Sequence, residues 1–177
     1  MAVAILGLSS FTEKEKGDVL VVKKGSVKIN GVKIASDWSL TSFTGALGKA
    51  DRERDGYNKT HTYDLKGVVL FESMKDNAPS GIISEFQYYL GEMPANNVTP
   101  KGIYPGVITI DKLKLTSSYI TFSEVKTKLK KWTQSDSYME HSYRLAKDGI
   151  YIYFQFNDSD TRLLKVSIGK DKRAETK

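Results

Sequence analysis

Residues 61–71 read His-Thr-Tyr-Asp-Leu-Lys-Gly-Val-Val-Leu-Phe, and residues 141–154 read His-Ser-Tyr-Arg-Leu-Ala-Lys-Asp-Gly-Ile-Tyr-Ile-Tyr-Phe. Each stretch is a histidine, a small hydroxyl residue, a tyrosine, a charge and a leucine, and then a glycine that opens an apolar run. His61 and His141, and likewise Gly67 and Gly149, are separated by about 80 positions, a long period that is typical of duplicated modules. The match predicts a chain built from two copies of one unit.

The residues before each stretch extend the match. Residues 27–34 alternate apolar and polar side chains around an Asn-Gly pair, which tolerates the positive φ angles of a tight hairpin turn. Residues 40–47 then place apolar side chains three and four positions apart, as one face of a helix requires. The segments 107–115 and 122–129 repeat this order in the second half.

We therefore expect an α+β fold with two tandem repeats, each made of a β-hairpin, one α-helix and about three antiparallel strands. The repeats would form one pseudo-symmetric domain with both helices on one side of an antiparallel sheet. The expected boundaries are an N-terminal segment at 1–25, repeat 1 at 26–91, a Pro/Gly linker at 92–106, repeat 2 at 107–169 and a basic disordered tail at 170–177.

Composition narrows the class of protein. Of the 177 residues, 40% are hydrophobic, which is enough for a packed core. The net charge of +6 favours acidic partners. The absence of cysteine excludes disulfides and thiolate chemistry.

Residues 1–10 are apolar and small, like the end of a signal-peptide core that runs into a cleavage pattern. An ordinary N-terminal strand is the alternative. The first interpretation predicts a periplasmic or exported protein with a truncated signal peptide, and the second predicts a cytoplasmic one. No other segment is long and apolar enough to cross a membrane.

The two histidines are the sharpest candidates for chemistry. His61 and His141 could ligate a metal, or one could act as a general base. No HxxxH, HxH or CxxC spacing accompanies them, so cross-strand packing is the expected role. The lysines over 126–131 could contact phosphates, but no nucleic-acid motif accompanies them. We expect no catalytic residue, metal, cofactor or nucleic acid, and therefore no enzyme.

The run 150–156 predicts a strand with two different faces. Its isoleucines and phenylalanines alternate with Tyr151, Tyr153 and Gln155, which would point away from the core. Tyrosine supplies a large contact area with few torsions to freeze, so an exposed pair suits a protein contact, although cross-strand packing alone is the alternative. The candidate partner-binding residues are Tyr151, Tyr153, Tyr89, Trp132, Arg52, Arg54 and Lys128.

The repeated order of Asn-Gly hairpin, helix, His-x-Tyr strand, glycine and apolar strand resembles small bacterial immunity proteins of toxin systems, over residues 26–169. The layout is also similar to the secreted β-lactamase inhibitory proteins, whose repeats carry cysteines that this chain lacks. The resemblance implies a non-enzymatic protein that neutralises a toxin or enzyme, here an acidic one, by stoichiometric binding. The alternative is an exported envelope protein that holds a small apolar ligand. The identity of the partner and the oligomeric state stay open.

Overall fold

The computed structural model describes residues 19–116, 118–135 and 139–171. The possible signal region at 1–10 and positions 172–177 of the expected tail lie outside this range. The elements are β1 (Val19–Lys23), β2 (Ser26–Ile29), β3 (Val32–Lys33), α1 (Leu40–Leu47), β4 (Arg52–Arg54), β5 (Lys59–Tyr63), β6 (Val68–Lys75), β7 (Ala78–Tyr89), β8 (Val107–Ile110), β9 (Leu113–Leu115), α2 (Phe122–Lys128), β10 (Thr133–Ser135), β11 (Ser142–Lys147), β12 (Ile150–Phe156) and β13 (Leu163–Lys170).

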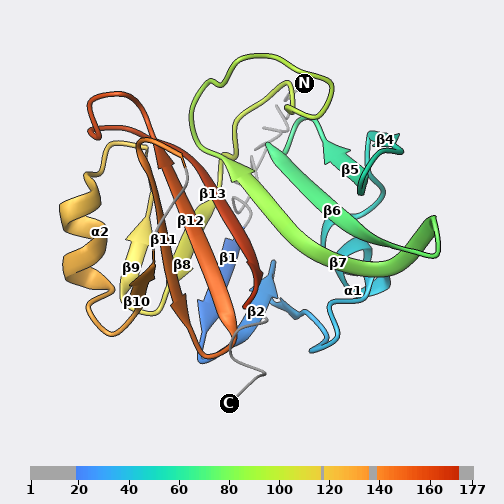
Figure 1. Cartoon of the computed structure of the whole chain (residues 1–177), viewed down its shortest axis with the longest axis horizontal. Helices are drawn as coiled ribbons and strands as arrows, with labels where there is room; N and C mark the ends of the chain where they lie inside the picture. The colour runs from blue at the N-terminus through green and yellow to red at the C-terminus, as the bar shows by residue number, and fades with distance from the viewer. Residues whose placement is uncertain (1–18, 117, 136–138, 172–177) are drawn as a thin grey trace, which may run out of the picture.

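The strands form two sheets that pack face to face (Figure 1). The larger sheet has eight strands in the order β10-β11-β12-β13-β7-β6-β5-β4, and every neighbouring pair is antiparallel. The smaller sheet has five strands in the order β3-β2-β1-β8-β9. Its β1–β8 pair is parallel, which the sequence did not predict. Strand β1, expected outside the repeats, therefore lies at the centre of this sheet.

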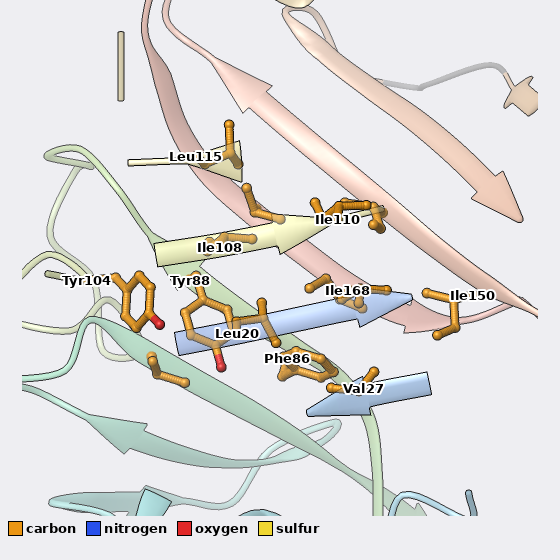
Figure 2. Close-up of a cluster of buried hydrophobic side chains, with 14 of the residues drawn as sticks. Leu20, Val27, Phe86, Tyr88, Tyr104, Ile108, Ile110, Leu115, Ile150 and Ile168 are labelled. Carbon is orange, nitrogen blue, oxygen red and sulfur yellow. The ribbon is translucent and has the colours of Figure 1, made fainter. Parts of the chain in front are cut away.

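The core lies between the two sheets (Figure 2). Alternating residues of the small sheet face alternating residues of the large one, because successive side chains of a strand point to opposite faces. The labelled side chains that meet there are Leu20, Val27, Ile108, Ile110 and Leu115 from the small sheet, Phe86, Tyr88, Ile150 and Ile168 from the large sheet, and Tyr104 from the linker.

The two helices close opposite ends of this sandwich (Figure 1). Helix α1 inserts Phe43 against Phe86, with ring centroids 5.2 Å apart, and Gly48 ends it at a φ of 83°. Helix α2 begins with a capping box, in which Thr121 and Glu124 satisfy each other's backbone N–H groups. Phe122 stacks on Tyr143 at 3.6 Å between ring centroids. Both helices therefore pack on the inner side of the large sheet.

The expected α+β class is wrong. Strands make up 48% of the structure and helices only 10%, so the fold is mostly β. The helices have eight and seven residues, and each presents only a few apolar side chains, too few to cover an eight-stranded sheet. The hairpins supply that cover instead, because their alternating apolar residues form a second sheet.

Several local expectations are confirmed. The Asn-Gly pair forms the β2–β3 turn, with φ angles of 53° at Asn30 and 81° at Gly31. Strand β12 alternates buried and half-buried residues along its whole length. The bounds expected for the linker stay a prediction, although the described residues 92–106 contain no strand or helix. Lys170, expected in the tail, is instead the last residue of β13.

The duplication itself stays a prediction. The meanders β4–β7 and β10–β13 meet at the β7–β13 pair, so the large sheet has the same meander on either side of this pair. Gly67 and Gly149 each end a turn at positive φ. Their surroundings differ, because a Cβ on Gly67 would overlap the backbone of Tyr104, whereas a Cβ on Gly149 would meet nothing within 4 Å. Superposing the Cα atoms of the two halves tests the duplication directly.

Candidate interaction face

The large sheet has an outer face, directed away from the small sheet. Strand register arranges its central side chains in three rows that cross β11, β12, β13 and β7. The first row is Ser142, Gln155, Lys165 and Tyr89; the second is Arg144, Tyr153, Ser167 and Gln87; and the third is Ala146, Tyr151, Gly169 and Glu85. We call these twelve residues the outer face.

The side chain of Tyr151 extends along the third row, from β12 over Gly169 of β13 to Glu85 of β7. A Cβ on Gly169 would overlap ring atoms of Tyr151, so the missing side chain of Gly169 leaves the space that this ring occupies. The Tyr151 hydroxyl thereby reaches over β13 and donates a hydrogen bond to Glu85 Oε2 at 2.7 Å. The Arg144 guanidinium lies 4.7 Å from the centroid of the same ring and pairs with Asp171 at 3.0 Å. The ring is therefore held from both sides.

A chain of hydrogen bonds continues along β7. Gln87 Nε2 donates to Glu85 Oε1 at 2.7 Å, and the Tyr89 hydroxyl donates to Gln87 Oε1 at 3.0 Å. Burial, with the Glu85 charge as a smaller cause, raises the pKa of Tyr89 to about 12. The same two causes raise the pKa of Tyr151. Both tyrosines are thus neutral hydrogen-bond donors at physiological pH.

A cavity of about 260 Å³ opens at the centre of the outer face. Its walls come from all three rows and from Met139. Among the described residues, the buried atoms Ser142 Oγ and Gln155 Oε1 have no hydrogen-bond partner. Lys165 also lines the cavity, and its ammonium nitrogen lies 5.7 Å from the Tyr89 ring centroid. Burial lowers the pKa of Lys165.

Arg52 and Arg54 lie on edge strand β4, on the same side of the large sheet as the outer face. The strand register connects Arg52 to Gln87 and Arg54 to Glu85 through opposite residues of β5 and β6. Arg52 makes two hydrogen bonds to Asp64, at 2.9 and 2.8 Å, and donates to linker carbonyls at Asn97 and Thr99. The hydrogen bond from Arg52 is the main cause that lowers the pKa of Asp64. Arg52 therefore clamps the linker to the sheet, whereas Arg54 is exposed.

Trp132 and Lys128 lie elsewhere. Trp132 is nearly buried and donates its indole N–H to Asp111 at 3.0 Å, beside the Lys147–Asp111 ion pair at 2.7 Å. Lys128 is exposed in α2, at the end of the sandwich. The register therefore brings Tyr151, Tyr153 and Tyr89 together and separates them from these two residues.

The two histidines occupy unlike sites. His61 lies in β5 with its side chain 3% exposed, and its ring nitrogens face Glu72 at 2.8 Å and Glu53 at 3.3 Å. His141 precedes β11 at a φ of 54°, is 33% exposed and faces Asp160 at 3.2 Å. Over residues 19–116, 118–135 and 139–171, no three His, Cys, Asp or Glu side chains form a metal-binding group. His61 links the buried Glu72 carboxylate to the half-exposed Glu53 carboxylate, whereas the sequence analysis expected cross-strand packing alone.

Sequence reasoning missed Glu85, Lys165 and Ser142. Each stands in a polar or mixed segment with no motif, and only the β13–β7 and β11–β12 registers place them beside the tyrosines. The alternation of β12 was the one signal available, and it correctly placed Tyr151, Tyr153 and Gln155 on a common face.

The geometry defines a two-sheet, mostly β domain with a polar and aromatic outer face. The chain belongs to the family described as "Domain of unknown function (DUF7738)", whose model matches residues 19–126. No curated protein matches this chain. No helix in the described part of the chain is long and apolar enough to span a membrane.

Three solved structures show distant similarity. They are an extracellular protein containing a SCP domain from Bacillus anthracis (6% identity, TM-score 0.48), a cysteine-rich secretory protein from Staphylococcus aureus (14%, 0.39) and a DUF4309 family protein, YjgB, from Bacillus subtilis (14%, 0.46). The matches cover 77%, 78% and 84% of this chain, and 44%, 45% and 89% of those chains. The chain thus spans less than half the length of the first two.

Proposed function

We propose that this chain is a non-enzymatic binding protein of the immunity or inhibitor type, which neutralises one partner protein by stoichiometric contact with the outer face. The observation that carries the proposal is the pair Tyr151 and Tyr153, which are half-buried on a sheet face that neither helix covers, beside the buried Tyr89. Tyrosine is enriched at the energetic centres of protein interfaces, where its ring adds contact area and its hydroxyl adds a hydrogen bond.

The tyrosines are also held in place before any partner arrives. Glu85 and Gln87 fix the hydroxyls of Tyr151 and Tyr89, and Tyr153 packs edge-on against Tyr151 at 5.6 Å between centroids. A side chain that is already ordered loses little entropy on binding, which would otherwise cost about 0.5–1.5 kcal/mol for each immobilised side chain. This pre-organisation supports tight binding by a small surface.

Charge supports an acidic partner. The chain carries a net charge of +6, and Arg54 is exposed at the β4 edge of the same face. Such charges mainly accelerate encounter and give it a marked dependence on salt. The expected complex therefore associates more slowly as ionic strength rises.

The test is affinity capture from the source cell with matched variants, followed by mass spectrometry. Wild-type protein should retain one partner at one-to-one stoichiometry, and Tyr153→Ala should lose it while the circular dichroism spectrum stays unchanged. Lys128→Ala, on a distant helix, serves as the control and should retain the partner. Capture that Lys128→Ala abolishes and Tyr153→Ala leaves intact would move the interface away from the outer face.

The alternative, an exported envelope protein with a small apolar ligand between helix and sheet, stays a prediction. At α1 that space holds the packed rings of Trp38, Phe43 and Phe86, whose centroids lie 5.2 to 6.1 Å apart. Extraction of the purified protein with organic solvent, followed by mass spectrometry for lipid, tests it.

A further inference from the structure

The first row of the outer face combines two buried polar atoms that lack hydrogen-bond partners among the described residues with the ammonium group of a neighbouring lysine. Ser142, Gln155 and Lys165 stand side by side on β11, β12 and β13. Ser142 is 4% exposed, and its Oγ, like Gln155 Oε1, is buried without a hydrogen-bond partner in the described part of the chain. A buried polar atom without a partner costs about 1–3 kcal/mol, so two such atoms on neighbouring strands, beside a lysine in the same cavity, indicate a site for a ligand.

The chemistry of the row specifies complementary groups. The Lys165 ammonium has only donors, so it requires an acceptor, and a negative one is favoured. Gln155 Oε1 accepts hydrogen bonds and therefore requires a donor, whereas the Ser142 hydroxyl serves either role. Ser142, Gln155 and Lys165 line one cavity of about 260 Å³, so the ligand must carry its anionic and donor groups within the span of that cavity.

We propose that this cavity binds an α-aminocarboxylate, meaning the carboxylate and α-nitrogen of one amino acid, either free or at the C-terminus of a peptide. The carboxylate lies at Lys165, and the α-nitrogen donates to Gln155 Oε1. Met139 supplies an apolar wall for the ligand's side chain, and Glu85 adds a negative charge that favours a free ammonium. The cavity volume of about 260 Å³ suits one amino-acid residue. This inference does not depend on the proposed partner protein.

The test is a titration of ¹⁵N-labelled protein, followed by NMR, with three matched probes. L-Alanine represents the free amino acid, N-acetyl-L-alanine represents a peptide C-terminus, and N-acetyl-L-alaninamide lacks the carboxylate. We expect saturable shifts around Ser142, Gln155 and Lys165 with the first probe, the second, or both, and none with the third. Binding of the first probe alone identifies a free amino acid, and binding of the second alone identifies a chain terminus.

Variants inside and outside the cavity test whether the probes bind at this site. Lys165→Met should weaken binding about tenfold or more, because it removes the charged donor. Lys75→Met, at an exposed position on β6, is the matched control and should bind as wild type does. Gln155→Leu should also weaken binding without lowering the stability of the free protein, since Gln155 Oε1 has no partner to lose among the residues that the structure describes. This variant replaces the first one if Lys165→Met does not fold. Equal binding of the amide probe, binding unchanged in both variants, or no saturable binding overturns the proposal.

Discussion

Glycine at position 169 should be essential for the arrangement of Tyr151. In Gly169→Ala, the new Cβ overlaps ring atoms of Tyr151, so the ring must swing away from β13. That movement breaks the 2.7 Å hydrogen bond to Glu85, which is charge-assisted. Overpacking costs about 1–3 kcal/mol, and a hydrogen bond to a charged group contributes about 1.5–3 kcal/mol.

The replacement also brings a gain, because alanine has less freedom than glycine in the unfolded chain, worth about 0.4–1 kcal/mol. We therefore expect a net loss of about 2–3 kcal/mol in the free energy of unfolding, measured by urea denaturation at pH 7. Gly45→Ala is the matched control, because this exposed glycine in α1 has no atom within 4 Å of a new Cβ. It should raise stability by about 0.5–1 kcal/mol.

A double-mutant cycle assigns the loss to Tyr151. In a Tyr151→Ala background the ring is gone, so Gly169→Ala should cost almost nothing, which gives a coupling energy of about 2–3 kcal/mol. If Gly169→Ala is neutral in the wild-type chain, or equally harmful without the Tyr151 ring, the reasoning from this contact is refuted.

Three further predictions concern buried polar groups. Asp64→Asn should lower stability by about 1–2 kcal/mol at pH 7, less than a fully buried pair because the Arg52 side chain is 36% exposed. Since the fold lowers the pKa of Asp64, its contribution is present above about pH 4 and lost as pH falls through the folded pKa, so urea denaturation from pH 7 to pH 3 should decline less steeply in the variant. His61→Ala should cost about 3–5 kcal/mol, because the buried Glu72 carboxylate loses its His61 partner and keeps, among the described residues, only the hydrogen bond from the Gly81 N–H. The same change at the more exposed His141 should cost under about 1 kcal/mol, and equal losses in the two denaturation curves would contradict this. In absorbance titrations, Tyr89 should remain protonated up to about pH 12, and its stabilising effect should be present below about pH 10 and fade above it. A Tyr89→Phe variant should therefore show the same absorbance step near pH 10 as the wild-type protein, and a smaller step there would contradict the assignment.

The sequence was informative wherever the signal was local. The Asn-Gly turn and the alternation of β12 depend on neighbouring residues, and both are confirmed. The prediction of an α+β fold was wrong because three apolar residues at helical spacing do not reveal how short a helix is. The pattern also does not reveal that β1 pairs with β8 in parallel.

The candidate face was only partly predictable for the same reason. Tyr151 could be placed on an outward side from its own strand, but its contact with Glu85 spans 66 positions and depends on the register across β13. Arg52 was expected at a partner contact, yet it serves the linker through Asp64. In both cases the deciding interaction lies between strands that are distant in the chain.

The most direct measurement is hydroxyl-radical footprinting of the one-to-one complex against the free protein, which reports side-chain exposure residue by residue. The account predicts that Tyr151 and Tyr153 lose reactivity in the complex, whereas Tyr119, which is 77% exposed, keeps it. Loss of reactivity at Tyr119 with no change at Tyr151 and Tyr153 would contradict the assignment of the outer face as the binding surface.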